Sequence, residues 1–141
     1  MASVKEKNTM KVPGIEFASS QMNYVLIERD ANGGLAITSA NRLSLGDTRS
    51  SDALRAFQSA VQTLFTSSAP DFIGIKDKPE KGAMRAGAAA LKMEGIVLAN
   101  APCEARFISG ARINKCDDSM PSLKAYHLPA FKAAFCALAD R

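Results

Sequence analysis

Two runs of β-branched and apolar residues, joined by a short glycine-rich connection, constrain the fold more than any other feature of the chain. The runs are residues 23–29 (NYVLIER) and 35–39 (LAITS), and the connection 30–34 reads Asp-Ala-Asn-Gly-Gly. Asn-Gly and Gly-Gly supply the positive φ angles that hairpin turns require. A third strand is predicted over residues 11–17, where Gly14 indicates close packing against a neighbouring backbone. Together the three segments predict an antiparallel meander.

Helix and strand signals alternate in the rest of the chain. A first helix is predicted after Ser50, which can cap it, because apolar residues then recur every three or four positions. These residues are Leu54, Phe57, Val61, Leu64 and Phe65. A buried strand is predicted over 71–76, a second helix over 82–100 and a further strand over 104–109.

The second and last helices present different kinds of side chain. Small residues on the second helix predict that it approaches a sheet closely. They are Gly87, Ala88, Ala89, Ala90 and Gly95. Pro129 stands at the predicted start of the last helix, which places Phe131, Phe135 and Leu138 on one face.

This order of elements predicts an α/β fold with a mixed five-stranded sheet. Strands joined by hairpins pair antiparallel, whereas each later strand follows a helix and is expected to enter the sheet through a right-handed parallel crossover. Helices are then expected on both faces of the sheet. At 141 residues the chain is of a size for one domain, predicted over 11–141, with residues 1–10 as a mobile tail.

Composition excludes several classes of protein. Hydrophobic residues make up 47% of the chain, a fraction too high for a disordered protein. Charged residues make up 23%, a fraction too high for a membrane protein. No apolar signal segment is present near the start, so a cytoplasmic protein is expected. Cys103, Cys116 and Cys136 show no paired spacing, so we expect reduced thiols and no zinc site with His127. His127 itself is expected on the surface or at a helix cap.

Basic residues concentrate in one part of the chain, at the end of the strand 71–76 and just beyond it. They are Lys76, Lys78, Lys81, Arg85 and Lys92. A cluster of this kind is what a phosphate-bearing partner requires, although a solvated charged face gives the same pattern. Aromatic residues do not alternate with these cations, so any nucleic-acid contact is expected to be mainly with phosphates.

Three segments resemble the bacterial Holliday-junction resolvases of the ribonuclease H-like superfamily. Residues 12–16 (VPGIE) are similar to their first strand, which ends in a metal-binding acid, and 70–76 (PDFIGIK) to their fourth strand, which begins Pro-Asp and ends in a second acid. Residues 89–95 (AALKMEG) resemble the helix that follows. The chain also resembles a small uncharacterised bacterial family of this superfamily. The resemblance implies a ribonuclease H-like fold and, in an active enzyme, carboxylates that bind Mg²⁺.

The acids that the resemblance requires are largely missing. Glu16 stands at the position of the first acid, but Lys76 stands at the second, and an ammonium group cannot bind a metal. Asp77 is adjacent but is expected to point to the opposite face of the strand. No Asp or Glu lies between Ser119 and Ala139, where the remaining acids are expected. We therefore predict an ion pair between Glu16 and Lys76, which could equally be a purely structural salt bridge.

The sequence favours a binding module over an enzyme. The leading hypothesis is a non-catalytic domain, with no cofactor, that binds nucleic acid or another phosphate-bearing ligand through Lys76, Lys78, Lys81, Arg85 and Lys92. One alternative is a nuclease in which Glu16, Asp77 and Glu80 bind Mg²⁺. Another is a module for protein interaction or homodimer formation, since sheet edges and helix faces of such a fold can pair.

Overall fold

The first three strands form the predicted meander. The computed structural model describes residues 9–82, 85–116 and 122–140. Strand β1 (Met10–Ala18) pairs antiparallel with β2 (Gln21–Arg29), which pairs antiparallel with β3 (Leu35–Ser44). Gly33 has a φ of +87° in the hairpin, and Asp30 accepts hydrogen bonds from the amides of Asn32 and Gly34. Strand β3 continues to Ser44, beyond the predicted end at residue 39.

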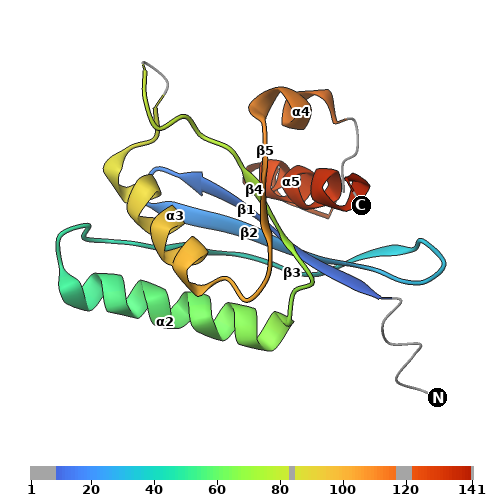
Figure 1. Cartoon of the computed structure of the whole chain (residues 1–141), viewed down its shortest axis with the longest axis horizontal. Helices are drawn as coiled ribbons and strands as arrows, with labels where there is room; N and C mark the ends of the chain where they lie inside the picture. Colours follow the sequence, from blue (N-terminus) through green and yellow to red (C-terminus); the bar gives the residue numbers. More distant parts are fainter. Residues whose placement is uncertain (1–8, 83–84, 117–121, 141) are drawn as a thin grey trace.

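The remaining elements complete a five-stranded mixed sheet. Strand β4 pairs parallel with β1, and β5 pairs parallel with β4, which gives the order β3-β2-β1-β4-β5 (Figure 1). The α/β architecture predicted from the sequence is therefore confirmed. After β3 the elements are α2 (Ser51–Ser68), β4 (Ile73–Lys76), α3 (Ala88–Asn100), β5 (Ala105–Ile108), α4 (Gly110–Lys115), the 3-10 helix η1 (Ala125–His127) and α5 (Leu128–Ala139).

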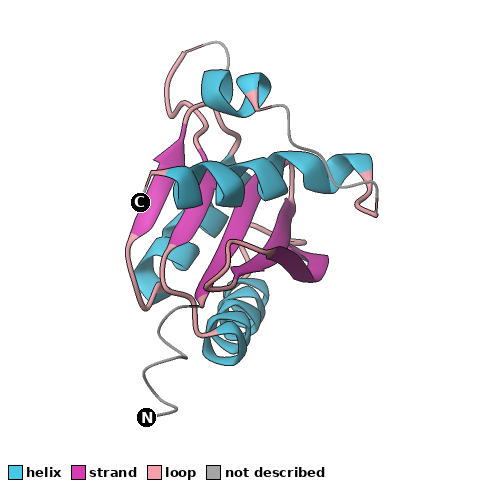
Figure 2. Cartoon of the chain, turned by 90° about the vertical axis from the view of Figure 1, so that its right-hand side faces the viewer, coloured by secondary structure: helices cyan, strands magenta, loops and turns pink. Residues whose placement is uncertain are grey.

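Helices cover both faces of the sheet, as predicted (Figures 1 and 2). Helices α2 and α3 pack on one face, where the core contains Ile15, Phe17, Phe57, Val61 and Met93. Helix α5 packs on the other, where the core contains Val12, Val25, Phe131, Ala134 and Leu138. None of the helices in the described ranges is long and apolar enough to cross a membrane.

Three boundaries differ from the predictions. Helix α3 begins at Ala88, not at Gly82, because Gly82 has a left-handed φ of +91° and Gly87 is an extended N-cap residue. Helix α4 was not predicted, since its six residues are too few to show a period; Ser109 caps it. Met10 belongs to β1 and not to the tail, and residues 1–8 lie outside the described residues.

Close helix-to-sheet packing occurs at α5 rather than at α3. A methyl group at Gly14 would overlap the Ala130 carbonyl and lie 2.8 Å from Ala134 Cβ, so the predicted role of Gly14 is confirmed. Gly74 on β4 has the same relation to Ala133. The predicted small-residue contact of α3 is wrong for Gly87, Ala88 and Gly95, which are exposed. The helix instead buries Ala90, Met93 and Val97.

Candidate functional site

Glu16 and Lys76 lie side by side at the carboxyl ends of β1 and β4. Ile15 is in register with Ile75, so the two residues that follow are neighbours on parallel strands. Side chains alternate along a strand, and the even-numbered Gly14 and Gly74 face α5, so Glu16 and Lys76 lie on that face too. Lys76 Nζ is 3.3 Å from Glu16 Oε2, and the exposed fractions of the two side chains are only 27% and 12%.

This ion pair has a definite chemical consequence. Lys76 can donate hydrogen bonds but cannot bind a metal ion, and the Glu16 carboxylate is already partnered by a fixed positive charge. A divalent cation at Glu16 would have to displace the Lys76 ammonium. The carboxyl edge of an open α/β sheet is also where such folds bind ligands. The pair therefore occupies a position suited to a site while opposing metal coordination there.

A row of polar residues continues from this pair across the sheet. Asn23 on β2 lies opposite Glu16, and Arg42 on β3 lies opposite Asn23. Arg42 Nε donates a hydrogen bond of 3.2 Å to Asn23 Oδ1. We call Lys76, Glu16, Asn23 and Arg42 the polar row. Sequence reasoning missed Arg42 because the third strand was expected to end at Ser39. Asn23 lay within a predicted strand, but its place opposite Glu16 depends on strand register, which no local pattern reports.

Asp77, the first acid after β4, faces the opposite side of the sheet from Glu16. Asp77 continues the ladder through its amide, which donates to Ile108 O, so its side chain alternates away from the α5 face. Burial raises the pKa of Glu94 on α3, and the negative charges of Glu80 and Asp77 raise that pKa further. Asp77 and Glu80 therefore lie close enough to Glu94 for their charges to act on it. No group of three metal-binding side chains is found within the described part of the chain.

Three of the five predicted basic residues already have partners within the fold. Lys92 Nζ donates a hydrogen bond of 2.7 Å to Thr48 O, which ties α3 to the connection between β3 and α2. Arg85 lies in the loop and not on a helix, and it donates to Gly82 O. Lys78 is half-buried and Lys81 is exposed in the same loop. Lys76 is engaged with Glu16, so Lys78 and Lys81 are the members best placed for an external ligand.

His127 occupies the N-cap position of α5 at the predicted helix entrance, but it is buried and not on the surface. Only 4% of the residue is exposed, and its Nε2 lies 2.9 Å from Asn41 O on β3. The side chain makes no capping hydrogen bond to α5. The correction arises because η1 packs against the meander, a contact between residues 86 positions apart that local sequence does not encode.

The three cysteines are free thiols at two places in the fold. Cys136 on α5 is buried next to Cys116, and burial together with that thiol raises the pKa of Cys136. Cys103 lies apart from them, near Asp71 and Glu104, and its pKa is raised mainly by burial. Thiols with raised pKa values are poor nucleophiles at neutral pH.

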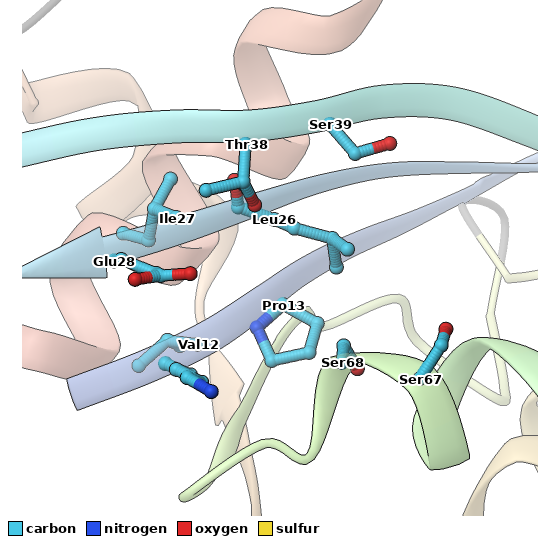
Figure 3. Close-up of a pocket in the computed structure, with 10 residues that line it drawn as sticks. Val12, Pro13, Leu26, Ile27, Glu28, Thr38, Ser39, Ser67 and Ser68 are labelled. Atoms are coloured by element: carbon cyan, nitrogen blue, oxygen red, sulfur yellow. The ribbon is translucent and has the colours of Figure 1, made fainter. Parts of the chain in front are cut away.

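A separate pocket lies between the sheet and the end of α2, away from the polar row. Its volume is about 270 Å³, and Figure 3 shows Pro13 and Leu26 facing Ser67 and Ser68 across it. It lies near the start of β1, whereas Glu16 lies near the end of that strand. None of the predicted site residues lines this pocket.

Comparison with known proteins identifies the fold. A family model described as "Protein of unknown function (DUF3010)" matches residues 10–137. The Thermus thermophilus RuvC structure has a TM-score of 0.73 at 9% identity, with 92% of this chain and 97% of that chain covered. T. thermophilus RuvC in complex with Holliday junction substrate gives 0.66 at 11%, covering 89% and 90%. These similarities confirm the predicted ribonuclease H-like fold.

A more distant structure supports the same assignment. The yeast mitochondrial Holliday junction resolvase Ydc2 has a TM-score of 0.53 at 12% identity, covering 71% of this chain and 50% of that chain. No curated protein matches the sequence. The similarity therefore establishes the architecture of the chain.

Proposed function

The chain belongs to the DUF3010 family, and we propose that it is a non-catalytic module that binds nucleic acid through phosphate contacts. The observation that carries the proposal is the Glu16–Lys76 ion pair, with Nζ 3.3 Å from Oε2. It stands on the α5 face at the carboxyl ends of β1 and β4, where the resolvase resemblance calls for two metal-binding acids. A fixed ammonium there opposes the binding of Mg²⁺ and with it the hydrolysis of phosphodiesters.

The distribution of acids argues against the nuclease alternative. Metal-assisted hydrolysis needs several oxygen ligands that converge on the same ions. Glu16 lies on the α5 face, whereas Asp77 and Glu80 approach Glu94 on the α3 side. The acids named for that alternative are therefore divided between the two faces of the sheet.

Two observations support nucleic acid as the ligand. The chain carries a net charge of +4, and Lys78 and Lys81 follow directly on the strand that presents Lys76. A protein of similar fold has been solved with a Holliday junction. Binding that depends on lysine–phosphate contacts is expected to weaken as salt increases, because it releases counterions from the nucleic acid.

The test is a titration of duplex, four-way-junction and single-stranded DNA at low and moderate salt, with and without Mg²⁺. We expect salt-sensitive binding that leaves the DNA intact. The variant Lys78→Ala/Lys81→Ala should bind less tightly and lower the slope of log K against log salt by about 1.8 on duplex DNA, since each phosphate that a lysine neutralises contributes about 0.9 to that slope. The matched control is Lys11→Ala/Arg29→Ala, which removes the same charge near the opposite end of β1 and should retain affinity.

Two results would overturn the proposal. Absence of DNA binding by the unmodified protein at low salt would remove nucleic acid as the ligand. Cleavage that requires Mg²⁺ and is abolished in Glu16→Gln would make the protein a nuclease.

A further inference from the structure

The described residues include two buried polar side chains, Asn23 and His127, and both support the same exposed site. They are 3% and 4% exposed. Burying a polar group costs free energy unless a hydrogen bond compensates. Asn23 forms its hydrogen bond with Arg42, and His127 with the backbone of Asn41, the neighbour of Arg42 in β3. Both buried side chains therefore form hydrogen bonds at or next to Arg42.

Arg42 is fixed on two sides. Its Nε donates to Asn23 Oδ1 at 3.2 Å, and its Cζ lies 3.8 Å from the centre of the Tyr126 ring. The Arg42 residue is nevertheless exposed. A guanidinium that stacks on an aromatic ring and has its Nε engaged is ordered, yet no acceptor in the described part of the chain bonds to either Nη group.

The position of Tyr126 is fixed by its ring contact with His127, which is bonded to β3. Tyr126 belongs to η1, and its ring lies 4.4 Å from the ring of His127. The His127 bond to Asn41 O joins η1 to β3. Lys124, just before η1, places its Nζ 5.9 Å from the centre of the same ring, which adds a second cation.

No carboxylate in the described ranges forms an ion pair with Arg42 or Lys124. The four salt bridges found there involve other residues. Two cations over one ring, with no ion-pair partner among the described residues, make a site of local positive charge. The planar fork of a guanidinium matches two oxygens of a phosphate group.

We propose that Arg42 and Lys124, held by Tyr126, form a binding site for a phosphodiester group of nucleic acid. The inference rests on the proposed function and adds a second contact point to it. Arg42 is three strands from Lys76, about 14 Å at about 4.8 Å for each step. Arg42 and the loop lysines Lys78 and Lys81, which follow Lys76, therefore lie toward opposite ends of the polar row, so they can contact different phosphates of one nucleic acid.

The experiment is the same DNA titration with single substitutions. Arg42→Ala should weaken binding about tenfold and lower the salt slope by about 0.9 on duplex DNA. Arg42→Lys keeps the charge but loses the forked geometry, so its affinity should be intermediate. Tyr126→Leu leaves both cations but removes their support, and it should weaken binding less than Arg42→Ala does. The control Arg55→Ala removes one exposed arginine from α2, on the other side of the sheet, and should bind as the unmodified protein.

The outcomes separate this inference from the proposed function. If the unmodified protein does not bind DNA, the proposed function fails and the phosphodiester site with it. If the protein binds DNA and Arg42→Ala binds as tightly as the unmodified protein, the site is wrong while the proposed function stands. Equal weakening by Arg42→Ala and Arg55→Ala would indicate a general charge effect and would also overturn the site. Thermal unfolding of each variant verifies that it is folded before binding is compared.

Discussion

The two faces of the sheet are built in different ways. On the α5 face, Gly14 and Gly74 let the helix backbone approach the strands, and the buried polar residues Asn23 and His127 support exposed charged and aromatic groups. On the other face, α2 and α3 meet the sheet through large apolar side chains such as Phe57 and Met93. The α5 face therefore has no room for a side chain at Gly14 or Gly74 and carries the candidate site, whereas the other face is an ordinary apolar core.

The largest expected effect comes from adding one methyl group to the α5 face. Gly14→Ala places Cβ against the Ala130 carbonyl, so strand or helix has to move. We expect a loss of about 3 kcal/mol in the free energy of unfolding, measured by urea denaturation. Gly46→Ala is the control, because a Cβ there would meet nothing within 4 Å. Equal stability of the two variants would show that α5 is not packed closely on the strands.

A glycine-to-alanine substitution in α3, on the other face of the sheet, should increase the free energy of unfolding instead of lowering it. Gly95 lies within α3, is exposed, and has no atom within 4 Å of an added Cβ. Gly95→Ala should raise the free energy of unfolding by about 0.5–1 kcal/mol, since alanine favours the helix over the unfolded chain. Thermal unfolding should show a higher midpoint. A lower midpoint would remove the contrast between α3 and α5.

The smallest effect should come from the acids near α3. Burial and the charges of Glu80 and Asp77 raise the pKa of Glu94, so the native state holds its proton more tightly than the unfolded state does. Stability therefore falls as the pH rises from the ordinary value of 4.5 through the raised pKa. Glu94→Gln removes this loss, so the variant should melt on the order of 1 °C higher at neutral pH and gain nothing at pH values below that window. An equal increase in melting temperature at both pH values would show that the ionisation of Glu94 is not the cause.

Local sequence patterns were sufficient for most of the fold. The Asn-Gly-Gly hairpin, the stripe of Phe57 and Val61, and the position of Gly14 each depend on neighbours in sequence or on a property of one residue. The structure agrees with all three. The start of α3 and the existence of α4 depended on turn geometry and capping, which the apolar period does not report.

Local sequence patterns predicted only part of the candidate site. Glu16 and Lys76 could be placed together because two adjacent strands end near them, and the structure contains their ion pair. Asn23, Arg42 and Tyr126 belong to three different elements, and no local pattern relates them. His127 carried no sequence signal for burial either.

Local sequence patterns were enough to order the five strands and the three long helices α2, α3 and α5, because alternation and helical period are set by which side chains need burial within a few residues. Which residues share the site depends instead on tertiary packing. Strand register aligned Glu16 with Asn23 and Asn23 with Arg42, and the packing of η1 on β3 brought Tyr126 over Arg42. Strand register and helix docking depend on the whole core, whereas secondary structure depends largely on local periodicity.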